Sequence, residues 1–165
     1  MSSWDDRPPE ERALLNPGYC GILLWKASSE YAAEVGDDMP LDIAFLVLPL
    51  ALHRAVRESL PRTVRTPLPV WLGEHPGSQA RVSELVTTLV PFTREALLFG
   101  GSNKMLSVSS QGVGAIGLAA HQVRVALGDA TEDMLASASR AAFVGKWLAR
   151  SGSGATVMAL FGLRP

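Results

Sequence analysis

The stretch from Gly112 to Gly117 is the part of the sequence whose residue spacing most resembles a cofactor site. Its letters, GVGAIG, fit the pattern G-x-G-x-x-G, in which a glycine-rich turn opens a helix and holds a dinucleotide pyrophosphate. Glu132 and Asp133 follow at about the distance at which that pattern places its ribose-binding acid. The pattern also requires a strand, a helix and a second strand, whereas a weakly helical segment and a long helix follow Gly117. We therefore interpret these glycines as part of a β-hairpin.

The other residue types that carry catalysis or bind metals are scattered. His53, His75 and His121 stand 22 and 46 residues apart, with no carboxylate at a spacing that would complete a metal site. Cys20, the single cysteine, lies among apolar neighbours, and we interpret it as a packed residue rather than a nucleophile. Neither a phosphate-binding loop nor a nucleophile elbow is present. We predict a protein that is not an enzyme and has no catalytic residues, cofactor or metal.

The elements that carry these residues are predicted to be mainly α-helical. A short helix starts after Pro8, and a longer helix over 19–35 has apolar residues three and four positions apart. The run from Ile43 to Leu52 is apolar on nearly all sides, which is typical of a buried helix. Pro49 is expected to kink this helix or to lie near its last turn.

Further along, a short helix is predicted around Trp71, followed by a helix from Ser78 that Pro91 interrupts and that continues to Phe99. Residues 104–109 and 113–118 are predicted to pair as a hairpin. A long helix over 130–150 and an apolar tail over 155–163 end the chain, and we expect the tail to pack on the body or on a partner.

This order of helices followed by a hairpin is that of a winged helix-turn-helix, and we assign such a core to residues 40–120. An acidic leader and helix, 1–39, precede the core, and a C-terminal helix and apolar tail, 121–165, follow it. All three parts are expected to form one compact unit, so the fold class is mainly α, with a winged-helix-like core and a small β-hairpin.

Composition limits the classes of protein that this chain can belong to. The chain has 165 residues, 47% of them hydrophobic, which is typical of a folded globular protein. Its net charge of −1 disfavours a free-standing nucleic-acid binder, because such domains are usually basic. The first 12 residues lack the apolar core of a signal peptide, and the longest apolar run, Ile43 to Leu52, is about half of a membrane span. We expect a cytoplasmic protein that does not bind a membrane.

The charges are unevenly distributed along the chain. Residues 1–42 carry nine acids against three bases, whereas residues 53–66 carry four arginines against one acid. Arginine pairs bidentately with carboxylates and phosphates. We therefore predict that five arginines contact an acidic or nucleic-acid partner: Arg54, Arg57, Arg62, Arg65 and Arg94. A solvated helix face is the alternative for the first four, and an ion pair near Glu95 is the alternative for Arg94.

Aromatic residues near the two ends of the chain suggest contacts with another protein. Trp4 and Arg7 lie in a polar, acidic leader, and Phe161 lies in the apolar tail. Tryptophan and arginine contribute to interface energies out of proportion to their number. We predict that these three residues pack on a protein partner, and a flexible leader is the alternative for Trp4.

A series of short segments, taken together and in order, resembles the middle component of bacterial three-component ABC systems. The resemblance covers nearly the whole chain. No single segment is diagnostic, but the combination and order are specific; the segments include NPGYC (16–20), FLVLPL (45–50), LVPFTREAL (89–97) and GKWLAR (145–150).

The resemblance implies an adaptor subunit without catalytic activity. Its partners would be an SMC- or Rad50-like ABC ATPase and a third component, an effector or C-terminal-domain protein, with DNA reached through the complex. Such systems are implicated in conflict with phage and plasmids, and Lamassu-type defence looks like a relative. The alternative is a stand-alone winged-helix transcription regulator. Residues 79–101 carry two bases and two acids, and a neutral recognition helix binds phosphates poorly.

Overall fold

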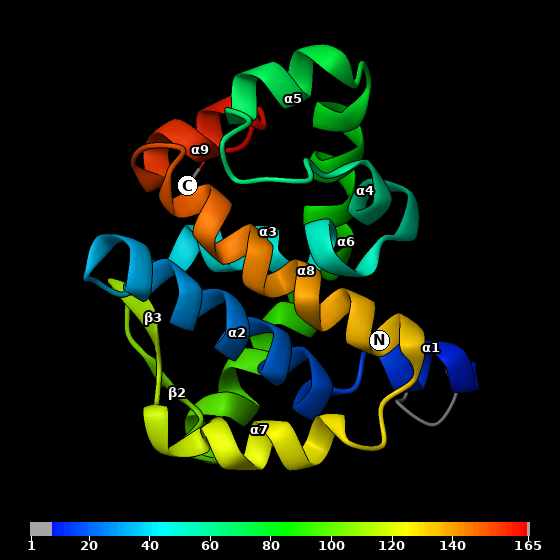
Figure 1. Ribbon diagram of the computed structural model, residues 1–165, viewed down its shortest axis with the longest axis vertical. Helices are drawn as coiled ribbons and strands as arrows, with labels where there is room; N and C mark the ends of the chain where they lie inside the picture. Colours follow the sequence, from blue (N-terminus) through cyan, green and yellow to red (C-terminus); the bar gives the residue numbers. More distant parts are fainter. Residues whose placement is uncertain (1–7, 165) are drawn as a thin grey trace.

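The computed structural model describes residues 8–164, and within them the chain is mainly α-helical with a small three-stranded sheet (Figure 1). The helices are α1 (Pro9–Leu14), α2 (Pro17–Val35), α3 (Leu41–Leu52), α4 (Arg54–Ser59), α5 (Leu68–Glu74), α6 (Ser78–Ser102), α7 (Ala120–Leu127), α8 (Glu132–Ala149) and α9 (Gly154–Leu160). A 3-10 turn, η2 (Gly117–Ala119), precedes α7. The predicted fold class, mainly α with a small hairpin, is confirmed.

Both ends of α2 and the start of α8 are set by local chemistry of the chain. The Asn16 side chain accepts hydrogen bonds from the backbone N–H groups of Gly18 (2.8 Å) and Tyr19 (3.2 Å), and this caps the start of α2. At its other end α2 stops at Gly36, whose φ of 76° is left-handed and favours glycine. Thr131 caps α8 in the same way by accepting the N–H of Met134 at 3.2 Å.

Helix α3 lies at the centre of the molecule, as its apolar sequence predicts. Ile43, Ala44 and every residue from Leu46 to Ala51 are buried. Pro49 lies in the last turn of the helix, in agreement with one of the two expected placements. Helix α3 is covered on nearly all sides because the other long helices, α2, α6 and α8, pack around it.

Helix α6 runs from Ser78 to Ser102 as a single helix, so the predicted interruption at Pro91 is wrong. Proline removes one backbone hydrogen bond, but Pro91 is exposed and its ring meets solvent rather than the core. Leu89 and Ala96 are buried on either side of it. The packing of these two residues stabilises a continuous helix, although Pro91 donates no backbone hydrogen bond.

The sheet contains the predicted hairpin and one strand that the sequence does not reveal. Strands β2 (Leu106–Val108) and β3 (Gly112–Ala115) pair antiparallel, which confirms the hairpin. The two-residue strand β1 (Met39–Pro40) pairs antiparallel with the other edge of β3, so the order is β1-β3-β2. The indole Nε1 of Trp25 donates to the carbonyl of Ile116 at 3.0 Å and ties α2 to the chain just after β3.

Helices α2 and α8 lie side by side across the middle of the molecule (Figure 1). A Cβ atom added at Gly145 of α8 would lie 2.7 Å from the Cα of Ala27 in α2, and closer still to the Ala27 carbonyl oxygen. Real Cβ atoms do not approach backbone atoms this closely. The two backbones are therefore in direct contact, and only glycine fits at position 145.

One hydrophobic cluster includes residues from all three parts of the chain that the sequence distinguishes. Leu23 of α2, Leu48 of α3 and Leu148 of α8 are fully buried in it. Phe161, which follows α9, is also fully buried, so the apolar tail packs on the body of the protein. The assignment of a winged-helix core to residues 40–120 stays a prediction, and the core of the protein extends beyond that range.

The α2–α8 contact predicts that Gly145→Ala destabilises the fold. The added methyl group would push the two helices apart, and overpacking of this kind costs about 2 kcal/mol of unfolding free energy. Chemical denaturation followed by circular dichroism measures this change. Gly73→Ala is the matched control, since a Cβ at Gly73, also in a helix, meets nothing within 4 Å. A Gly145→Ala protein as stable as the Gly73→Ala protein would contradict the close contact.

Candidate partner-binding surface

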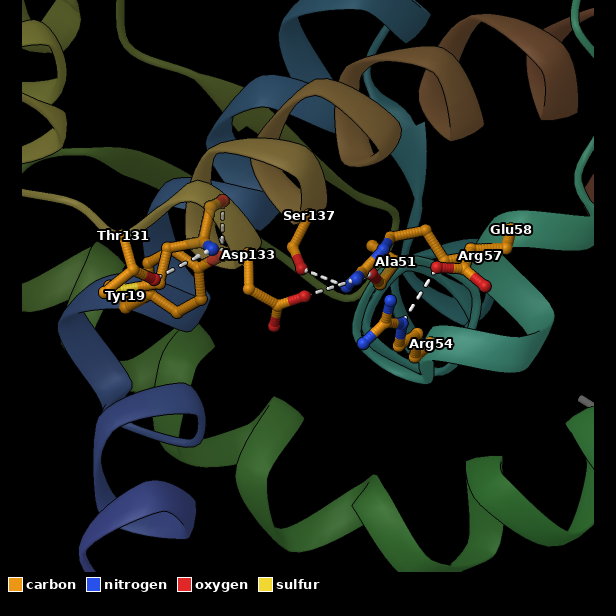
Figure 2. Close-up of polar contacts among 9 residues, drawn as sticks. Tyr19, Ala51, Arg54, Arg57, Glu58, Thr131, Asp133 and Ser137 are labelled. Atoms are coloured by element: carbon orange, nitrogen blue, oxygen red, sulfur yellow. Dashed lines mark hydrogen bonds and ion pairs between the residues drawn. The ribbon is translucent and has the colours of Figure 1, made fainter.

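Arg57 lies inside the molecule, where it joins three helices (Figure 2). Its Nη2 forms an ion pair with Asp133 of α8 at 2.5 Å. Its Nη1 donates to Ser137 Oγ at 2.6 Å and to the carbonyl of Ala51, at the end of α3, at 3.3 Å. Arg57 is only 5% exposed, and both of its terminal nitrogens donate within the protein. The expectation that Arg57 contacts a partner is therefore corrected: this side chain stabilises the fold.

Tyr19 fixes the start of α8 against α2, beside the Arg57 network (Figure 2). Its hydroxyl donates to the carbonyl of Met134 at 2.7 Å. Burial raises the pKa of Tyr19 to about 12, so the phenol stays protonated and remains a donor at neutral pH. The same turn carries Asp133, whose carboxylate is directed toward Arg57 in Figure 2.

Residues 60–67 connect α4 to α5 without regular structure, and three side chains hold this segment in place. Arg140 donates through Nη1 to the carbonyl of Pro61 at 3.2 Å. Trp147 donates through Nε1 to the carbonyl of Thr66 at 2.8 Å. Trp71 donates to the carbonyl of Ser59, the residue just before the segment, at 2.7 Å. We name residues 60–67 the arginine loop, because Arg62 and Arg65 lie within it.

The residues of α8 that hold the arginine loop also pack on one another. The Arg140 guanidinium lies 4.9 Å from the centre of the Phe143 ring, which is within the range of a cation–π contact. Phe143 stacks on Trp147 with ring centres 5.9 Å apart, and Trp147 meets Trp71 edge-on at 5.5 Å. Sequence reasoning misses Arg140, although its spacing from Phe143 and Trp147 places all three on one side of a helix.

The remaining predicted contact residues in this region are exposed. The Arg54 side chain is 78% exposed and pairs with Glu58 one turn later at 2.8 Å. Arg62 and Arg65 are exposed, and within residues 8–164 neither forms an ion pair. Arg54, Arg62 and Arg65 therefore present positive charge to solvent.

The other predicted contact residues are not brought to this surface. Arg94 is exposed on α6, and the described part of the chain contains no ion pair between Arg94 and Glu95. Trp4 and Arg7 lie outside the described residues. Phe161 is fully buried, so the expectation that it packs on a partner is corrected: it packs on the core.

A shallow polar depression lies between α4 and α8, next to the arginine loop. It has a volume of about 350 Å³ and is lined by Arg57, Glu58, Ala136, Ser139 and Arg140. Because Arg140 both lines this depression and holds Pro61, the depression and the arginine loop form one continuous surface.

The glycine-rich stretch has a packing role. A Cβ at Gly114 would lie 2.5 Å from Asp38 Oδ1, and a Cβ at Gly112 would lie 2.9 Å from the Met39 carbonyl oxygen. The glycines therefore let β3 approach the chain around β1 closely. After η2 the described chain continues into α7 and α8, with no strand following, so the strand–helix–strand unit of a dinucleotide site is not formed.

Cys20 is fully buried, and its Sγ lies 3.3 Å from the carbonyl oxygen of Leu14. Burial raises the pKa of the Cys20 thiol to about 12, which keeps it protonated and unreactive. Among the residues that the structure describes, no three His, Cys, Asp or Glu side chains gather as a metal site would require. No helix in the same part of the chain is both long enough and apolar enough to cross a membrane.

These features define a small, mainly α-helical protein with a fixed cationic surface. Residues 4–165 match a family model described as ABC-three component (ABC-3C) system Middle Component 3. The chain belongs to this family of middle components, which confirms the resemblance seen in its sequence. No curated protein and no solved structure matched the chain.

The Arg57 network predicts that Arg57→Ala destabilises the protein, whereas Arg54→Ala does not. Removing Arg57 leaves Ser137 and Asp133 without their partner, and the expected loss is about 2 kcal/mol of unfolding free energy. Arg54 offers a matched control in the same helix, because its ion pair with Glu58 is solvent-exposed. Urea denaturation of both variants measures the difference. Equal midpoints for the two variants would contradict a structural role for Arg57.

Proposed function

We propose that this protein is a non-catalytic adaptor, the middle subunit of a three-component complex built on an SMC- or Rad50-like ABC ATPase. The observation that carries this proposal is the family match over residues 4–165, which covers all of the described chain. The complex would act in the cytoplasm in defence against phage or plasmids, with a third component as the effector. DNA would be reached through the assembled complex.

The surface of the protein supports an adaptor role, because it offers two chemically different regions. The arginine loop is cationic. Elsewhere, Leu98 of α6 is 71% exposed and Val125 of α7 is 62% exposed. Phe99 and Val123 of the same two helices line an apolar groove of about 460 Å³. Phe99, which lines this groove, is itself 39% exposed, and exposed apolar side chains at a groove are typical of surfaces that bind other proteins.

Co-expression with the other two components of the system tests the adaptor proposal. We expect this protein to purify in a defined complex that contains the ATPase, with a mass by mass photometry that corresponds to fixed subunit ratios. Purification of this protein alone, with neither component bound, would contradict the proposal. A screen for DNA binding by the isolated protein would then test the alternative, a stand-alone transcription regulator.

A further inference from the structure

We infer that the arginine loop and the adjoining face of α8 form a docking surface for an acidic segment of another protein component of the system. This inference rests on the proposed adaptor function and adds which surface is used and what chemistry the partner must have. The residues that would contact the partner are Arg62, Arg65 and Arg140, with Arg54 at the edge of the surface.

The arginine loop is held in place before any partner binds. The carbonyls of Pro61 and Thr66, near its two ends, accept hydrogen bonds from Arg140 and Trp147 of α8. A loop fixed in this way loses little conformational entropy on binding, because most of that entropy is already lost on folding. Leu60 of the loop is buried in the core cluster, which holds the loop further, whereas Arg62 and Arg65 are exposed on it.

Positive charge is left unmatched on this surface. The two acids that contact this region are already paired within the protein, Glu58 with Arg54 and Asp133 with Arg57. Arg62, Arg65 and Arg140 form no ion pair within residues 8–164. Guanidinium groups form bidentate hydrogen bonds with carboxylates, so a segment rich in Asp and Glu is the complementary ligand.

The distribution of acidic residues around this surface favours a protein carboxylate over a nucleic-acid phosphate as the ligand. Helix α8 begins with Glu132 and Asp133, and the Asp133 side chain is 49% exposed beside Arg57. Negative charge at the edge of the patch disfavours a continuous polyanion such as a phosphate backbone. The net charge of −1 on the whole chain likewise disfavours extended contact with a polyanion.

The test compares a double charge reversal in the loop with a matched reversal elsewhere. Arg62→Glu/Arg65→Glu alters only exposed side chains, so we expect wild-type circular dichroism and melting behaviour. Arg81→Glu/Arg164→Glu makes the same change in charge at two exposed arginines outside the loop. Affinity for the co-purified ATPase and third component is measured for each variant by biolayer interferometry at low and high salt.

We expect Arg62→Glu/Arg65→Glu to raise the dissociation constant roughly tenfold or more at low salt, with a smaller effect at high salt, because exposed charge pairs are screened. The control should stay within about twofold of wild type. If the wild-type complex forms and the loop variant binds as tightly as the control, the docking surface is wrong while the adaptor function stands. If the wild-type protein binds neither component, both the docking surface and the adaptor function are contradicted.

A fluorescent DNA duplex separates the two kinds of anionic partner. We expect no difference in duplex binding between the isolated wild-type protein and Arg62→Glu/Arg65→Glu. Binding by the wild type that the loop variant abolishes would mean that the loop binds phosphate, and this result would overturn the inference of an acidic protein segment.

Discussion

The backbone contact between Gly145 and Ala27 fixes where α8 lies, and the position of α8 determines most of the rest of the structure. With no side chain at position 145, α8 lies directly against α2, the helix that supplies much of the core. The first turn of α8 is tied to the same helix through Tyr19 and Met134. A rigid helix in the middle of the protein then serves as a platform for the segments on its other sides.

Two kinds of interaction attach other segments of the chain to α8. The buried Arg57 attaches α4 and the end of α3 to α8, so it acts as a structural link despite its charge. Further along α8, Arg140 and Trp147 hold the arginine loop by its carbonyl groups. The cationic surface therefore depends on the core through α8, which fixes the arrangement of its charged side chains.

Local sequence patterns predict the elements of this fold well, because helices and hairpins depend on neighbouring residues. The apolar run of α3 and the hairpin around Gly112 both follow from short-range spacing. Pro91 is the exception within an element, because buried neighbours on the same helix compensate for its missing hydrogen bond. The functional assignments of the arginines are harder to predict, since their surroundings are formed by distant parts of the chain.

Arg57 and Arg140 illustrate this difficulty. Arg57 reaches Asp133 across 76 positions of sequence, and Arg140 reaches Pro61 across 79. In the sequence, Arg57 is indistinguishable from Arg54, although one is buried and the other is exposed. Arg140 stands outside the dense basic stretch, yet it holds the loop in place. The packing of α4 against α8 determines which arginine is structural, because it buries Arg57 and leaves Arg54 exposed.

Hydrogen–deuterium exchange on the free protein and on the assembled complex tests most directly whether the arginine loop is the contact surface. The account predicts that assembly slows exchange in peptides covering residues 54–67 and 136–143. Unchanged exchange in both peptides, with protection appearing only in other parts of the chain, would contradict it.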